Sequence, residues 1–407
     1  MKKSIIYSFI CCIGILSLAG CKKQVDLLPT DVILPAFAFT NVNDLQSGLN
    51  TAYARYDGEL TSYLNTILSD EARLGRNNGG QGQFANRWQY GQDATTGGDV
   101  TAGWLSFYRM IQACNIVLDN IPRVAVTTSA DSTKKSQIRA QAIALRALGL
   151  FELQQLYAKG PYNPANLGVP IVTTYVDPNT LPKPPRNTSG EVMNQIQTDL
   201  TLASSLLPAV TAVNFTDLTI NRLNITGLQA RVALYKGEWQ KAIDSATFVI
   251  NSNIRPLVGL PAFADIWTDV NITSEVLFRI KRNSSGSSVD TYYTTTTNAV
   301  YFSPSVKLRN SYSPGDNRIN AYIATFNAAL PNNYVVFKYF QSTALGGRIN
   351  DLKAMRISEM YLIRAEALVE STGLATAGTA DLTTLRTARM QALLRFCYHR
   401  CGDSFYI

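Results

Sequence analysis

The sequence predicts a mainly α protein, built as a solenoid of tetratricopeptide-like helical pairs with an irregular, loop-rich second lobe. Three observations predict this class. Apolar residues recur at three- and four-residue steps in several long segments, which is typical of amphipathic helices. Alanine and glycine occupy the positions where the two helices of a tetratricopeptide unit touch. Long segments rich in Gly, Asn, Pro and aromatic residues separate the helical ones.

The apolar spacing predicts each helix in order along the chain. The expected helices cover residues 44–56, 102–121, 137–157, 188–207, 224–235, 239–246, 355–370 and 381–389. The helix over 137–157 is apolar on most sides, so we expect it to be buried between others. Thr188 and Glu191 have the spacing of a capping box. Three aromatic residues at helical spacing are expected in the core: Trp104, Trp239 and Tyr361.

The helical pair over 224–246 carries the clearest signal. Small residues and one aromatic follow the order of a tetratricopeptide unit: Ala230, Ala233, Gly237, Trp239, Ala242 and Ala246. Only small side chains let two helix axes approach closely, which explains alanine at these steps. Such pairs stack into a solenoid, because each unit buries a face of its neighbour.

Three irregular segments interrupt the helices, over residues 74–103, 157–186 and 258–350. The third contains two strand-like runs, at 276–280 and 334–340. Loops longer than about 15 residues in compact domains are usually functional or disordered. The many aromatic residues in these segments favour a function.

Composition and charge exclude several function classes. The chain has 407 residues, of which 46% are hydrophobic and 16% charged, so it is large enough for a sizeable core. The net charge is +8, but no run of Lys or Arg is longer than two, so we expect no nucleic-acid partner. His399 is the single histidine, which argues against a Ser-His-Asp triad and against multi-histidine metal sites. The six cysteines do not predict a disulfide framework, and no cofactor is expected.

The N-terminus has the form of a secretory signal. Two lysines precede an apolar run over 5–18, which is shorter than the roughly 20 residues of a membrane-spanning helix. Leu18-Ala19-Gly20-Cys21 resembles the lipobox of bacterial lipoproteins, in which the chain is cut before a cysteine that is then acylated. The alternative is an ordinary signal peptide with an incidental cysteine.

Five segments carry a family resemblance, in the same order along the chain. They are the lipobox; Asn43-Asp44-Leu45 with Leu49-Asn50-Thr51-Ala52-Tyr53; Gly103-Trp104, Tyr108-Arg109, Ala113-Cys114-Asn115 and Leu118-Asp119-Asn120-Ile121; Ala144-Leu145-Arg146-Ala147, Phe151-Glu152-Leu153 and Leu156-Tyr157; and Met355 to Ala367 followed by Leu382 and Leu385-Arg386. Together they resemble the SusD/RagB family of outer-membrane glycan-binding lipoproteins. The last segment is the most specific to that family.

The resemblance implies a helical solenoid core that faces an irregular lobe carrying the ligand site. Members of the family sit on the outer face of the outer membrane in Bacteroidetes-type bacteria. They act as lids on a TonB-dependent transporter of the SusC type and capture oligosaccharides or peptides for import. The resemblance therefore implies a lipid-anchored binding protein and not an enzyme.

These features divide the chain into four predicted parts. We expect a signal peptide over 1–20, a lipidated tether over 21–30 and a helical domain over 31–390, with an inserted ligand-binding lobe at about 258–350. Residues 391–407 depart from the family pattern, so a truncated or out-of-frame terminus is expected there. That end holds three potential zinc ligands, Cys397, His399 and Cys401, but a structural zinc site usually needs four in spaced pairs.

Candidate ligand residues are placed by region, because ligand residues vary among family members. Sugars bind against aromatic faces while planar polar groups fix their hydroxyls. The predicted binding residues are Asp70, Arg73, Asn86, Trp88, Tyr90, Tyr292 and Tyr301, with Tyr293 and Tyr312 as further tyrosines of the second lobe. Local packing is the alternative role for the aromatic residues, and a surface ion pair is the alternative for Asp70 and Arg73.

Two other functions remain open at this point. One is a protein-interaction adaptor that uses the concave face of the solenoid. The other is a glycoside hydrolase, which needs two carboxylates about 5–10 Å apart. Asp and Glu together number 29, so the sequence alone does not exclude a hydrolase.

Overall fold

The computed structural model describes residues 38–95, 97–177, 180, 183–259, 262–269, 274–282, 289–294, 299–325, 334–339 and 349–390. Several predictions fall outside these ranges: the signal peptide over 1–20, Cys21, the tether over 21–30, and the zinc alternative at Cys397, His399 and Cys401 within 391–407. All elements described below belong to one compact unit that begins at Asn41. Within the described ranges, no helix combines the length and apolarity that crossing a membrane requires.

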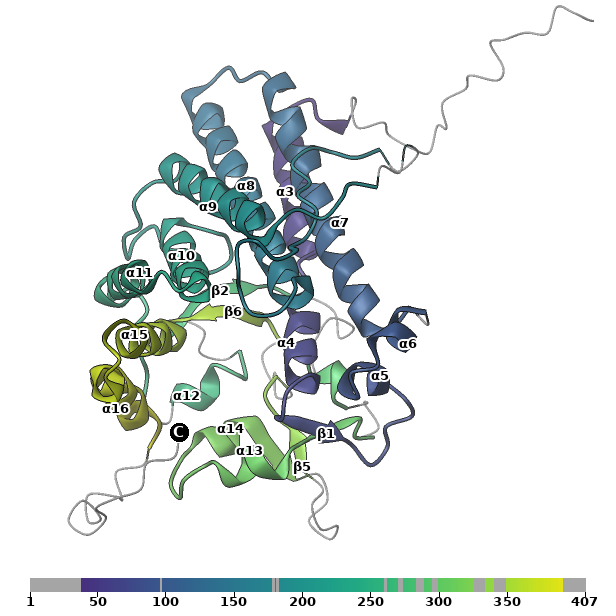
Figure 1. Ribbon diagram of the computed structural model, residues 1–407. Coiled ribbons are helices and arrows are strands. Elements are labelled where there is room, and N and C mark those ends of the chain that lie inside the picture. The colour runs from purple at the N-terminus through teal and green to yellow at the C-terminus, as the bar shows by residue number, and fades with distance from the viewer. Residues whose placement is uncertain are drawn as a thin grey trace, which may run out of the picture. The chain divides into compact units, whose positions relative to one another are not determined.

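Nine helices of ten or more residues dominate the described part of the chain (Figure 1). They are α3 (Val42–Ala54), α4 (Gly58–Ile67), α7 (Asp99–Asn120), α8 (Ser129–Tyr157), α9 (Ser189–Leu206), α10 (Arg222–Lys236), α11 (Trp239–Asn251), α15 (Ile357–Thr372) and α16 (Thr379–Arg389). Each helix from α7 to α11 packs on the next, and α15 continues the stack between α11 and α16. The predicted mainly α fold with tetratricopeptide-like pairs is confirmed.

Local sequence explains where these helices begin and turn. Thr188 and Glu191 form the predicted capping box at the start of α9: the Glu191 amide donates to Thr188 Oγ1 at 3.2 Å, and the Thr188 amide donates to Glu191 Oε2 at 2.8 Å. Gly237 ends α10 with a left-handed φ of 72°, a conformation that glycine adopts without steric cost. The four predicted contact alanines are buried between the paired helices: Ala230, Ala233, Ala242 and Ala246.

Two expectations about the helices are corrected. The helix predicted over 355–370 begins at Ile357, because Met355 and Arg356 pair with a neighbouring strand. The three aromatics expected in the core are only half-buried: Trp104, Trp239 and Tyr361. Trp239, for example, lies over the turn at Gly237, where a Cβ would meet its ring at 3.4 Å.

Three two-stranded antiparallel sheets join segments far apart in the sequence. β1 (Ala72–Leu74) pairs with β3 (Phe302–Pro304), β2 (Val276–Ile280) with β6 (Leu352–Arg356), and β4 (Ile323–Thr325) with β5 (Tyr334–Val336). The strand-like run at 276–280 is confirmed as β2. Of the run predicted at 334–340, residues 334–339 are described, and the first three of these form β5.

Short helices fill the irregular segments. They are α5 (Gln83–Asn86), α6 (Tyr90–Thr95), α12 (Ala262–Asp265), α13 (Val306–Asn310) and α14 (Arg318–Tyr322), with 3-10 turns η2 (Ile121–Arg123), η4 (Val289–Tyr292) and η5 (Ala375–Gly378). Helices α12, α13 and α14 lie below the β2–β6 ribbon (Figure 1). Together with strands β2 to β5 they belong to the described part of the second lobe.

Candidate functional site

The β1–β3 sheet brings together two segments that the sequence analysis selected separately. Arg73 in β1 lies opposite Ser303 in β3. Just beyond the sheet, the carbonyl of Tyr301 accepts hydrogen bonds from the Gly75 amide at 2.7 Å and from Asn78 Nδ2 at 3.0 Å. Arg73 and Tyr301, which are 228 positions apart by their numbers, therefore lie on neighbouring strand segments. We call the region of Arg73, Tyr301 and the following loop with Trp88 and Tyr90 the exposed face.

Trp88 stands on the loop that continues from this sheet. Its side chain is 68% exposed and its backbone has a left-handed φ of 59°, which is unusual for a bulky residue. The preceding helix α5 is held on α4 because Asn86 Nδ2 donates to the Ile67 carbonyl at 2.8 Å. Tyr90, at the start of α6, is 46% exposed. Trp88 and Tyr90 thus present aromatic surface to solvent, whereas the Asn86 amide is used to fix the loop.

Asp70 takes part in a surface ion pair, but its partner is Lys307 in α13 and not Arg73. The Lys307 ammonium lies 2.8 Å from Asp70 Oδ2, and both side chains are about 80% exposed. The hydrogen bond and charge of Lys307 lower the pKa of Asp70. Exposed pairs of this kind contribute little to stability. Because its side chain is exposed, Asp70 remains accessible at the edge of the exposed face.

Tyr63 in α4 contacts three aromatic residues of the second lobe. Its ring stacks on Tyr292 with centroids 4.7 Å apart and meets Tyr293 and Phe302 edge-on at 6.1 and 5.6 Å. Tyr63 Oη donates to Asp99 Oδ2 at 3.1 Å, which fixes the ring. One ring face of Tyr292, a predicted binding residue, is therefore covered by Tyr63. Tyr293 is 3% exposed, so packing accounts for most of its surface.

A cavity of about 500 Å³ lies between the second lobe and the helical stack. We call it the aromatic cavity, because five of its lining residues are Trp267, Tyr293, Tyr312, Tyr322 and Tyr339. Its remaining walls come from α4, β6, α15, α13 and the segment after β5. Sequence reasoning missed Trp267, Tyr322 and Tyr339, since nothing in the local pattern separates them from other aromatics of the same irregular segment.

Lys338 lies among the rings of this cavity. Its Nζ is 4.5 Å from the Trp267 ring centroid and 5.0 Å from that of Tyr322, both within cation–π range. Burial, reinforced by the charge of Arg356, lowers the pKa of Lys338 to about 7. Two further polar atoms in the lining, Trp267 Nε1 and Ser358 Oγ, are buried and have no hydrogen-bond partner among the described residues.

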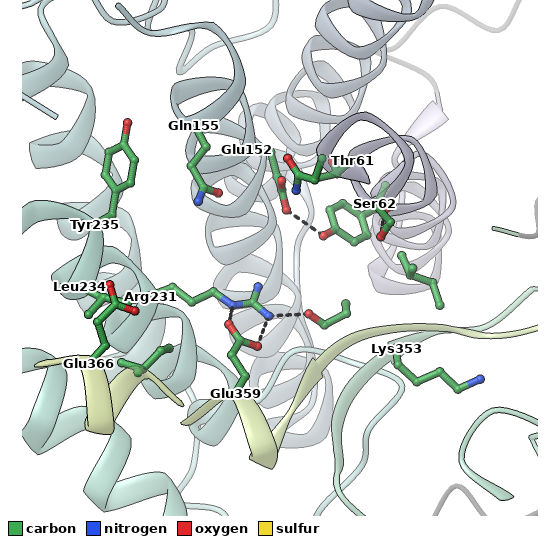
Figure 2. Close-up of a pocket in the computed structure, with 16 residues that line it drawn as sticks. Thr61, Ser62, Glu152, Gln155, Arg231, Leu234, Tyr235, Lys353, Glu359 and Glu366 are labelled. Carbon is green, nitrogen blue, oxygen red and sulfur yellow. Dashed lines mark hydrogen bonds and ion pairs between the residues drawn. The ribbon is translucent and has the colours of Figure 1, made fainter. Parts of the chain in front are cut away.

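A second cavity, of about 570 Å³, adjoins the first one and is polar. The two share four lining residues: Ser62, Lys353, Ala354 and Glu359. Figure 2 shows Arg231 of α10 facing Glu359 of α15, with Arg231 Nη2 at 2.7 Å from Glu359 Oε2 and 2.6 Å from the Ala354 carbonyl oxygen. Burial disfavours the Arg231 cation, but Glu359 outweighs this effect and raises the pKa of Arg231.

Glu152 of α8 lies across this polar cavity. Its Oε1 accepts a hydrogen bond from Tyr56 Oη at 3.0 Å, as Figure 2 also shows. Burial raises the pKa of Glu152, although the charge of Arg231 opposes this shift. The carboxylates of Glu152 and Glu359 are thus each held by a partner within the protein. This arrangement suits a structural polar network between α4, α8, α10 and α15.

Comparison with known proteins gives two family matches. The model described as "Starch-binding associating with outer membrane" matches residues 30–234, about half of the chain. The SusD family model matches residues 268–389. SusD-like protein P2 of Formosa agariphila is 29% identical over 292 residues, which are 69% of this chain and 53% of that protein. The chain thus spans about half the length of this relative.

Solved structures share the fold. A SusD superfamily protein from Bacteroides thetaiotaomicron has a TM-score of 0.74 at 23% identity and covers 87% of this chain and 82% of its own. A laminarin-binding SusD-like protein has a TM-score of 0.62 at 19% identity, with 86% of this chain and 84% of its own covered. At these identities the likeness concerns the fold.

Proposed function

The chain belongs to the SusD family, and from this membership we propose that it captures oligosaccharides at the cell surface and delivers them to a TonB-dependent outer-membrane transporter of the SusC type. It acts as a binding protein and carries out no reaction on the glycan. Lipid attached to Cys21 holds it at the outer membrane. Peptides are the alternative ligands within the same function.

The observation that carries this proposal is the β1–β3 pairing. It brings the strand of Arg73, with its planar guanidinium, beside the segment of Tyr301, and the loop of Trp88 continues from the same sheet. An aromatic face covers the C–H surface of a sugar ring, and planar polar groups bind the hydroxyls at its edge. The 68% exposure of Trp88 leaves its ring available for such a contact. The exposed face therefore offers both kinds of group that glycan binding needs.

Titration of residues 22–407 with defined oligosaccharides tests the binding step. Laminarin and starch oligosaccharides are the first probes, because one structural relative binds laminarin and one family model is described as starch-binding. We expect tryptophan fluorescence to change on binding and Trp88→Ala to weaken affinity at least tenfold. Phe248→Ala is the matched control, since Phe248 is 60% exposed but lies on α11. Equal affinity of wild type and Trp88→Ala for every bound oligosaccharide would exclude this site.

Two measurements in the native host test the location and the partner. Cys21→Ser removes the proposed lipid attachment, so we expect the mature protein to leave the membrane fraction. Wild-type protein solubilised from the outer membrane is expected to co-purify with a large β-barrel transporter. A wild-type protein recovered alone, or a Cys21→Ser variant that stays membrane-bound, contradicts the corresponding part of the proposal.

A further inference from the structure

The aromatic cavity is separate from the exposed face. Its lining contains neither Trp88 nor Tyr90 nor Tyr301. Its volume of about 500 Å³ falls within the range of about 300–1,000 Å³ that small-molecule sites usually have. Apolar side chains from four elements also line it: Val289, Leu308, Val336 and Leu362. The cavity thus has the size and the apolar walls of a site for one small ring-shaped ligand.

The ammonium form of Lys338 has no ion-pair partner among the described residues. Its Nζ makes cation–π contacts with the faces of three rings. Those faces come from Trp267, Tyr322 and Tyr339, at 4.5, 5.0 and 5.8 Å. Cation–π contacts compensate a buried ammonium only in part, because burial removes its hydration. The site therefore gains stability when an anion approaches Lys338.

Three other charged groups in the lining are already paired. Lys353 Nζ lies 2.6 Å from Asp269 Oδ1, and Arg356 Nη1 lies 3.4 Å from Glu275 Oε2. Arg356 also packs on Trp267, with its guanidinium carbon 4.9 Å from the ring centroid, and so adds positive potential beside Lys338. The Glu359 carboxylate is bound by Arg231. Glu71 also lines the cavity and its negative charge acts on Lys338, but Glu71 is exposed, so solvent weakens this effect. Lys338 therefore has no carboxylate in direct contact among the described residues.

Two buried polar groups of the lining have no hydrogen-bond partner among the described residues. Trp267 is 2% exposed and Ser358 is 7% exposed, and both line the cavity. Trp267 Nε1 can only donate a hydrogen bond, and the Ser358 hydroxyl can donate one. A buried donor without a partner destabilises the folded protein, because it has lost its hydrogen bonds to water. An anionic oxygen accepts from such donors more strongly than a neutral one does.

We propose that the aromatic cavity is a second ligand site, which takes an acidic sugar and binds its carboxylate or sulfate group at Lys338, Trp267 Nε1 and Ser358 Oγ. This inference rests on the proposed glycan function for the sugar part of the ligand, whereas the anion part follows from the unpaired groups alone. The apolar walls receive the C–H face of the ring. The site gives the protein a preference for glycans that carry negative charge.

Isothermal titration of the full mature chain with monosaccharides tests this proposal. Glucuronate and glucose 6-sulfate are the two acidic probes, and glucose is their neutral counterpart. We expect at least one acidic sugar to bind at least tenfold more tightly than glucose. Inorganic sulfate is the further control, since equally tight binding of sulfate alone contradicts the role of the sugar ring. Equal affinity for glucose and both acidic sugars overturns the proposal.

Variants at Lys338 test whether the preference for acidic sugars comes from the aromatic cavity. Lys338→Met is expected to abolish the preference for acidic sugars, while Lys338→Arg keeps the charge and retains part of the preference. Lys307→Met is the matched control, because Lys307 is exposed and lies outside the cavity. A Lys338→Met protein that keeps the full preference overturns the proposal.

Trp88→Ala separates this inference from the proposed function. Trp88 lies outside the cavity lining, so acidic monosaccharides should bind Trp88→Ala as they bind the wild type. Loss of oligosaccharide binding in Trp88→Ala with acidic binding intact supports both sites. Acidic binding that disappears in Trp88→Ala places the anion on the exposed face and overturns the cavity proposal, while leaving the proposed function standing.

Discussion

Glu59 and Arg282 form a buried ion pair across 223 positions of the sequence. Arg282 Nε lies 2.6 Å from Glu59 Oε1, and Arg282 Nη2 lies 2.7 Å from Glu59 Oε2. The same Nη2 also donates to the Tyr56 carbonyl at 2.7 Å. Glu59 is in the first turn of α4, and Arg282 follows β2. The pair therefore fixes the β2 segment to the helix that carries Tyr63.

Replacement of Arg282 by alanine should destabilise the protein strongly. The change leaves the Glu59 carboxylate buried without its partner, which typically costs about 3–5 kcal/mol in the free energy of unfolding. Urea denaturation followed by circular dichroism measures this loss. Lys307→Ala removes the exposed partner of Asp70 and is expected to cost less than about 1 kcal/mol. Similar losses in the two variants would contradict the structural role of the buried pair.

The helices could be predicted because their signals are local. Ala230, Gly237 and Ala246 lie within one helical pair, and the spacing of small and apolar residues reports their contact directly. Helix α4 was missed, although Leu60 and Leu64 have helical spacing and are buried. The predicted helix ended at residue 56, and α4 begins only two residues later, at Gly58.

The site could be predicted only by region, since its contacts are long-range. The segments of Arg73 and Tyr301 come together through a strand pairing that no local sequence pattern predicts. The aromatic cavity assembles Trp267, Lys338 and Ser358 from three separate segments. A lysine in a sequence is normally assigned to the surface, and only the folded chain reveals that Lys338 is enclosed by rings.

Gly82→Ala should disturb the loop that carries Trp88. Gly82 has a left-handed φ of 59°, and a Cβ there would lie 2.0 Å from Tyr63 Oη. The strained backbone and the overlap together should cost about 1–3 kcal/mol and shift α5. We expect weaker oligosaccharide binding in fluorescence titrations and a lower melting temperature. Gly79→Ala is the control, because a Cβ at Gly79 has no neighbour within 4 Å. A Gly82→Ala protein as stable as the control would refute this close approach.

The free energy of unfolding should depend on the titration of Lys338. Burial lowers its pKa from 10.5 to about 7, so the unfolded chain binds a proton that the folded chain lacks between these values. Stability from this group therefore rises with pH over that range, by up to about 1.4 kcal/mol per pH unit. The charged and titratable groups around Lys338 in the cavity are Glu71, Tyr293, Tyr312, Tyr322, Tyr339, Lys353, Arg356 and Glu359.

Comparison with Lys338→Met isolates this contribution, because the other groups are common to both proteins. In urea denaturation at pH 7, 8 and 9, the wild type should gain stability relative to Lys338→Met as the pH rises. A difference that stays constant over this range would show that Lys338 titrates at its ordinary pKa in the folded protein.

Arg389→Ala should loosen the attachment of the last helix. Arg389 ends α16, and its Nη2 lies 2.7 and 2.9 Å from the two carboxylate oxygens of Glu275, which is fully buried beside β2. Arg356 remains 3.4 Å from Glu275 after the change, so we expect a loss near the lower end of the range for buried pairs, about 3 kcal/mol. Urea denaturation measures it, with the exposed Arg386→Ala as control at less than about 0.5 kcal/mol. Equal stability of the two variants would mean that α16 is held by packing alone, without the Glu275 contact.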